Sequence, residues 1–120
     1  FLAGVLADDP GAGLLPSDSV LRFFADGTGA EVLPGLAETR ALASAALTTD
    51  GRAFLFGGLA GWQATARAES YSPAQGPTAL ASLPFARYNH TVTRLADGRF
   101  LIAGGENETI ELIPLAWIYE

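Results

Sequence analysis

The chain repeats itself with a spacing of 47 residues, and this repeat limits its possible folds more than any other feature. Three landmarks recur at that spacing: Arg40 at Arg87, Asp50-Gly51 at Asp97-Gly98, and Gly57-Gly58 at Gly104-Gly105. Counting backwards, Tyr71 and Gly76 match Phe24 and Gly29 in an earlier copy, whose loop between residues 5 and 19 is longer. A fixed period of this length predicts a row of similar small units, each packed against the next.

Each unit contains a hairpin signal. The segments 43–49 and 52–56 flank Asp50-Gly51, and the same pattern surrounds Asp97-Gly98. Glycine readily adopts the positive φ that mirror-image hairpin turns require, and aspartate tolerates it. We therefore expect two strands joined by a tight mirror-image turn in each unit.

Two further strands complete the unit. The segment 66–71 is expected to be the third strand, ending at Ser72-Pro73, and the segment 78–81 the fourth. No segment shows the apolar spacing of three and four residues that is typical of a helix. A period in this range with four short antiparallel strands is typical of a β-propeller blade, so the predicted fold class is all-β.

The sequence resembles the kelch repeat, whose signature is an arginine, an Asp-Gly turn, a glycine pair and then Glu-x-Tyr. The segment from Arg87 to Gly105 matches the first three parts, and Glu69-Ser70-Tyr71 matches the last. The resemblance implies kelch-type blades of four antiparallel strands: residues 1–36 as strands two to four, 37–83 as a complete blade, and 84–120 as strands one to three. Because propellers typically close with about 4 to 8 blades, we expect an incomplete ring whose remaining blades come from the same longer chain or from other chains.

Composition excludes several function classes. The net charge is −6, and the basic residues are arginines without any cluster, so nucleic acid is not an expected partner. The absence of lysine excludes Schiff-base chemistry and the phosphate-binding Gly-Lys-Ser/Thr motif, and the absence of cysteine excludes disulfides and thiolate ligands. No apolar run is long enough to span a membrane.

The candidate binding face is formed by the loops after strands two and four, opposite the Asp-Gly turns. The candidate ligand-binding residues on this face are Trp62, Gln63, Arg40, Arg87, Tyr88, Asn89 and His90. Each has an alternative role: Trp62 packing over a neighbouring unit, His90 as a structural hydrogen-bonding group, and the arginines bonding strand carbonyls in every unit. The residues expected to build the repeat itself are Gly57, Gly58, Gly104, Gly105, Asp50, Gly51, Asp97, Gly98 and Tyr71.

These observations favour a non-enzymatic scaffold that binds a protein, a peptide or a glycan, with no catalytic residue, no metal and no cofactor. One alternative is a fragment of a galactose-oxidase-like or mutarotase-like kelch enzyme, although the chain lacks the cysteine and second histidine of the oxidase pattern. Another is a purely structural repeat of a cell-surface assembly. The composition resembles that of a bacterium with a high-GC genome, and exported bacterial kelch proteins favour a secreted or envelope location, but the compartment stays open.

Overall fold

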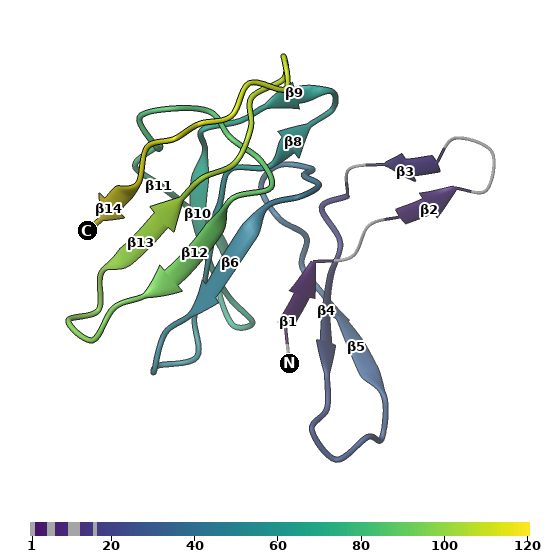
Figure 1. Cartoon of the computed structure of the whole chain (residues 1–120). Helices are drawn as coiled ribbons and strands as arrows, with labels where there is room; N and C mark the ends of the chain where they lie inside the picture. Colours follow the sequence, from purple (N-terminus) through teal and green to yellow (C-terminus); the bar gives the residue numbers. More distant parts are fainter. Residues whose placement is uncertain (1, 5–6, 10–12, 16) are drawn as a thin grey trace.

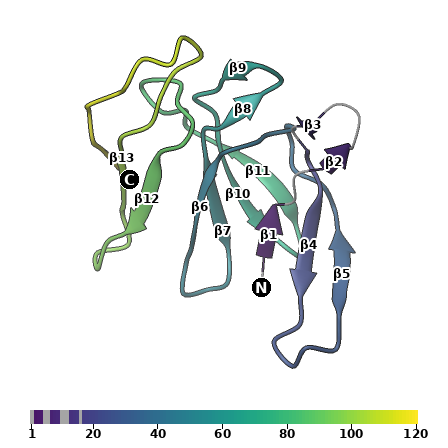
Figure 2. The ribbon, with the colours of Figure 1, turned by 45° about the vertical axis from the view of Figure 1, so that its right-hand side comes forward.

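The computed structural model describes residues 2–4, 7–9, 13–15 and 17–120, and the described chain is built from β-strands without any helix. Three open antiparallel sheets follow one another along the chain and lie side by side (Figures 1 and 2). The prediction of an all-β fold is confirmed. Within the described ranges, no helix is long and apolar enough to cross a membrane.

Each sheet is formed by strands that are close together in sequence. The first sheet has the order β1 (Leu2–Gly4), β4 (Val20–Phe23), β5 (Ala30–Leu33). The second has the order β11 (Gly76–Leu80), β10 (Ala68–Ser72), β7 (Ala53–Phe56), β6 (Ser44–Leu47), and the third β12 (Thr91–Arg94), β13 (Phe100–Ala103), β14 (Trp117–Tyr119). The four strands expected between residues 43 and 81 are therefore present, with ends shifted by a few residues.

The Asp-Gly hairpins are present, but their turns differ from the expected mirror-image type. Leu47 pairs with Ala53, and the amide of Thr48 donates to the carbonyl of Arg52 across three intervening residues. Only Gly51 has a positive φ, 83°, and Asp50 does not. This is a three-residue connection with glycine in the left-handed position.

Aspartate serves the turn through its side chain. Its carboxylate accepts hydrogen bonds from the hydroxyl of Thr48 and the amide of Arg52, which holds the loop closed. In the third sheet the carboxylate of Asp97 accepts from the amide of Arg99 at 3.0 Å and from its Nε at 2.8 Å. The turn therefore needs aspartate for its side-chain hydrogen bonds and glycine for its backbone freedom.

Two short hairpins lie in connections that the sequence predicted as loops. They are β2 (Ala7–Asp9) with β3 (Gly13–Leu15), and β8 (Leu59–Ala60) with β9 (Gln63–Ala64). In the second, Gly61 has a φ of 64°, which permits the sharp reversal. Hairpins this short carry too few apolar residues to show a period in the sequence.

The core lies between adjacent sheets, because successive residues of a strand point to opposite faces. On β7, Ala53 and Leu55 face the first sheet, and Phe54 and Phe56 face the third. The ring of Phe56 stands edge-on to Tyr119 with their centroids 5.0 Å apart, a favoured aromatic geometry. Burying each such side chain stabilises the fold by about 1.5–3 kcal/mol, so the sheets stabilise one another.

The contacts that join the sheets recur with the period of the sequence. The hydroxyl of Tyr71 donates to the carbonyl oxygen of Pro34 at 2.5 Å, and that of Tyr119 donates to Ala81 at 2.6 Å. In both cases a tyrosine of the third strand holds the chain as it leaves the preceding sheet. The repeat is therefore one of tertiary contacts as well as of sequence.

Candidate functional site

The connections of variable length gather at one end of the sheets. Figure 1 shows the β8–β9 hairpin and the β13–β14 connection at this end, and the turns at Asp50-Gly51 and Asp97-Gly98 at the opposite end. We call this end the loop face. It is the part of the molecule where side chains are least constrained by sheet packing.

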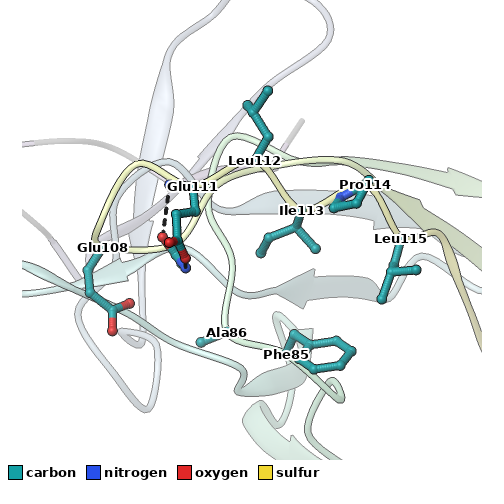
Figure 3. Close-up of a pocket in the computed structure, with 9 residues that line it drawn as sticks. Phe85, Ala86, Glu108, Glu111, Leu112, Ile113, Pro114 and Leu115 are labelled. Atoms are coloured by element: carbon teal, nitrogen blue, oxygen red, sulfur yellow. Dashed lines mark hydrogen bonds between the residues drawn. The ribbon is translucent and has the colours of Figure 1, made fainter.

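A shallow depression of about 360 Å³ lies on the loop face between the β13–β14 connection and the segment before β12 (Figure 3). We call it the loop furrow, and its lining residues are Phe85, Ala86, Asn107, Glu108, Glu111, Leu112, Ile113, Pro114 and Leu115. Three of its apolar side chains are exposed to solvent: Phe85 by 52%, Leu112 by 80% and Leu115 by 53%. Apolar groups gathered in an open furrow are typical of a surface that binds a partner.

A smaller cavity of about 180 Å³ continues from the furrow, because Phe85 and Leu115 line both. Its other lining residues are Pro84, Arg87, Ala116 and Trp117. We call this cavity the arginine slot, since Arg87 is the charged residue of its wall. A third hollow, of about 550 Å³, lies along β14 and shares Trp117 with the slot.

The loop that forms one wall of the furrow is held in a fixed shape. The side-chain oxygen of Asn107 accepts hydrogen bonds from the amides of Thr109 and Glu111, both at 3.0 Å, and its Nδ2 donates to the Glu111 carboxylate. Ile110 has a φ of 61°, which is unfavourable for a β-branched residue. Local strain of this kind is maintained by the surrounding hydrogen bonds and is common at binding sites.

The two repeated arginines bind carbonyl groups within their own sheets. Nη1 of Arg40 donates to the carbonyl oxygens of Gly57 at 2.9 Å and Arg67 at 3.4 Å. Nη1 of Arg87 donates to the equivalent carbonyls of Gly104 and Leu115, both at 3.0 Å. Both arginines are buried, and each ties the end of a second strand to the start of a third.

His90 is buried between the second and third sheets instead of lying open on the loop face. Neither ring nitrogen makes a hydrogen bond of standard geometry among the described residues, although the backbone of Phe56 acts as a weak partner that opposes part of the pKa shift. Burial and the nearby Arg87 guanidinium lower the pKa of His90 to about 4, so the imidazole is neutral near neutral pH. Within the described part of the chain no three side chains of His, Cys, Asp or Glu come together to hold a metal ion.

The remaining predicted residues lie on or near the loop face. Trp62 is 79% exposed at the tip of the β8–β9 hairpin, so within the described chain it does not pack over a neighbouring unit. Gln63 begins β9 beside it and is also exposed. Tyr88 pairs through its backbone with Glu106, and Nδ2 of Asn89 donates to the Glu106 carboxylate at 3.3 Å. Apart from Arg87, none of the predicted ligand-binding residues lines the furrow or the slot.

Glycine is needed in the two glycine pairs for two different reasons. A Cβ on Gly58 would lie 2.7 Å from the carbonyl oxygen of Ala41, and one on Gly105 would lie 2.7 Å from that of Tyr88. A Cβ on Gly57 would also overlap its neighbours, whereas one on Gly104 would meet no atom within 4 Å. At Gly104, within the described residues, the positive φ of 68° is the feature that favours glycine.

The sequence analysis missed Phe85, Leu112, Leu115 and Trp117, which form the apolar walls. A signal was present, because the segment 110–117 is strongly apolar although it connects two strands. A scan against models of known protein families and a search of curated proteins find no match to this chain. The function is therefore argued from the site itself.

Proposed function

We propose that this chain is a stretch of kelch-type propeller blades whose loop face binds an extended segment of a partner protein. The blade assignment is supported by the succession of sheets, each a meander of neighbouring strands with its core against the next sheet. A radial series of small twisted sheets has this arrangement. Because the described sheets are open and side by side, further blades would complete the ring.

Repeated hydrogen bonds support the same assignment. The bridge between Ala41 and Leu59 recurs, 47 residues later, between Tyr88 and Glu106. Leu42 and Asn89 are also equivalent, and each has a φ of 54°, which few residues other than glycine adopt. Units that share such uncommon backbone geometry are copies of one structural motif.

The observation that carries the binding proposal is the gathering of exposed apolar side chains in the loop furrow. Ile113 and Leu115 of the β13–β14 connection point toward Phe85 across an open depression (Figure 3). Leu112 lines the same depression, but its side chain points away from Phe85. Aliphatic walls of this kind suit apolar side chains of a peptide better than the hydroxyl groups of a glycan. An extended peptide could place alternate side chains into the furrow and the slot.

The hollow along β14 is left out of the proposed surface. In the second sheet, β11 pairs with the free side of β10, and the equivalent side of β14 borders this hollow. In a complete blade a fourth strand would pair there. Binding is therefore assigned to the loop furrow and the arginine slot.

Binding is favoured over catalysis by the character of the lining residues. The furrow walls are mainly aliphatic and aromatic, and Glu111 is engaged by Asn107. The single histidine of the chain is buried and lines neither of the two cavities. The aliphatic and aromatic walls provide contact area and a shape that a binding partner can complement.

A selection from a displayed library of random linear peptides tests the proposal on the purified protein that carries this chain. We expect enriched peptides with apolar residues, whose binding is lost in Leu115→Asp and kept in Val32→Asp. Val32 is a matched control because it is 80% exposed and lies on β5, in another sheet. Failure to enrich any peptide, or equal binding to both variants, would overturn the proposal.

A further inference from the structure

Arg40 and Arg87 hold equivalent carbonyl groups but face different neighbours. Nη2 of Arg40 lies 2.8 Å from Oε1 of Glu69 and 3.7 Å from Oε2 of Glu38. The other carboxylate oxygen of Glu69 accepts a hydrogen bond from the amide of Ala37 at 3.0 Å. In the second sheet, then, the buried guanidinium has two carboxylates beside it.

In the third sheet both carboxylates are replaced by aromatic residues. Phe85 stands where Glu38 stands in the preceding copy, 47 residues earlier. Trp117 takes the position of Glu69, since Trp117 pairs with Ile102 as Glu69 pairs with the equivalent Leu55. The amide donor of Ala37 is also lost, because Pro84 occupies that position.

These replacements leave a cavity in place of the carboxylates. The arginine slot, of about 180 Å³, is lined by Arg87 together with Pro84, Phe85 and Trp117. Arg87 is 1% exposed, and among the described residues it makes no ion pair. Its two hydrogen bonds use Nη1 alone, and Nε has no partner in the described chain.

A buried guanidinium without a counter-ion is unfavourable, because desolvation is not repaid by an opposite charge. At Arg87 two carbonyl acceptors offset part of the desolvation cost. They leave other N–H donors of the planar guanidinium group unused. A carboxylate is the group that best satisfies such a fork, through parallel charge-assisted hydrogen bonds.

We propose that the arginine slot binds a carboxylate of the ligand, which takes the place that Glu69 fills in the second sheet. The rings of Phe85 and Trp117 would contact the apolar stem that carries the carboxylate. A volume of about 180 Å³ holds the equivalent of roughly six water molecules, which matches the five non-hydrogen atoms of a glutamate side chain. The net charge of −6 repels anions in general, so binding here requires this local arrangement.

This inference rests on the proposed binding function and names the chemistry of its partner. The carboxylate has two sources: an acidic side chain of a partner protein, or a free carboxylic acid of a few carbons. The first would bind together with apolar neighbours in the loop furrow, and the second would bind in the slot alone. Their relative affinities therefore tell them apart.

The test is an NMR titration of the purified protein with propionate, followed at the backbone amides of Leu115 and Ala116 in the slot wall. Propionamide, which has the same shape without the charge, is the matched control. We expect propionate to shift these resonances with an affinity about tenfold or more above that of propionamide. Equal titration by both compounds, or no shift with either, would refute a carboxylate site.

A second pair of variants keeps the test independent of Arg87, whose removal would disturb the fold. Trp117→Glu supplies an internal carboxylate at the position of Glu69 and should abolish the propionate shifts. Trp117→Gln, which has the size of glutamate without its charge, removes the ring contact and should weaken the shifts, but it should keep the preference for propionate over propionamide. Loss of the shifts in both variants, or in neither, would contradict the inference.

Peptides identify the source of the carboxylate. If a blocked leucine-rich peptide with one glutamate binds about tenfold more tightly than propionate, and its glutamine analogue does not, the partner is an acidic protein segment. If propionate binds as tightly as the peptide, the ligand is a free acid. The carboxylate site is then supported and the peptide-binding function is not. If library peptides bind the furrow while propionate and the glutamate peptide show no charge preference, the binding function stands and the slot proposal fails.

Discussion

Gly57 lies directly against His90, so that a Cβ on the glycine would come within 2.8 Å of Cε1 of the imidazole. Gly57 follows the last residue of β7 in the second sheet, and His90 immediately precedes β12 in the third. The same Cβ would also overlap the carbonyl oxygen of Arg87. The two sheets therefore meet at a point where a methyl group has no room.

Alanine at Gly57 should destabilise the fold more than alanine at the equivalent Gly104. Both positions have a positive φ, 58° and 68°, so each substitution costs about 1 kcal/mol in backbone strain. Within the described chain, Gly57→Ala adds steric overlap that Gly104→Ala does not, worth about 1–3 kcal/mol more. Urea unfolding measures the difference, and equal losses in the two variants would contradict the contact described above.

Acid should weaken the fold through His90. Its folded-state pKa of about 4 lies below the ordinary value of 6.5, so as pH falls from 6.5 the unfolded chain binds a proton that the folded chain does not. The free energy of unfolding should therefore fall by up to about 1.4 kcal/mol per pH unit in this window and level off near pH 4. His90→Leu should remove this slope, as shown by urea titrations at several pH values, and an unchanged slope would refute the assignment.

Neutralising Glu69 should be far more damaging than neutralising Glu38. The Glu69 carboxylate is buried 2.8 Å from Arg40, and Glu69→Gln leaves that guanidinium without its main counter-ion, at a cost of about 3–5 kcal/mol. Glu38 is partly exposed and lies 3.7 Å from the same arginine, so Glu38→Gln should cost below about 1 kcal/mol. Thermal unfolding of both variants provides the comparison. Similar losses would show that the buried pair is not the dominant partner of Arg40.

Removing the Tyr71 hydroxyl should loosen the junction between the first and second sheets. Tyr71→Phe deletes the hydrogen bond to Pro34 and should lower the free energy of unfolding by about 1 kcal/mol. Tyr88→Phe is the control, because the Tyr88 hydroxyl makes no hydrogen bond within the described chain, and it should change stability little. Hydrogen exchange at the amide of Leu36, which bonds to Asp18, should speed up in the first variant and not in the second.

Most of the sheet structure could be predicted from local residue patterns. Asp50-Gly51 and Gly57-Gly58 mark strand ends by their own backbone and side-chain preferences, so the limits of β6 and β7 follow from the sequence. The turn type could not be predicted, because Asp50 acts through its carboxylate and not through a positive φ. The small β8–β9 hairpin was not predicted, because it is too short to show an alternating pattern of apolar residues.

The candidate site was only partly predictable. Exposure of Trp62 follows from its place in a loop, but the burial of His90 depends on the second sheet packing against the start of the third. The loop furrow requires Phe85 and Leu115 to line one depression from segments that are far apart in the sequence, and no local pattern indicates this. The arginine slot was visible in principle, since aligning the copies places Phe85 and Trp117 on the positions of Glu38 and Glu69.

We propose above that the repeated sheets are successive blades of a propeller. A crystal structure of the complete protein that contains this chain tests it most directly. We expect further sheets of the same kind, arranged in a ring, with the tyrosine contacts of Tyr71 and Tyr119 repeated between blades. Strands that pair between the repeated segments, or sheets that do not close around an axis, would contradict it.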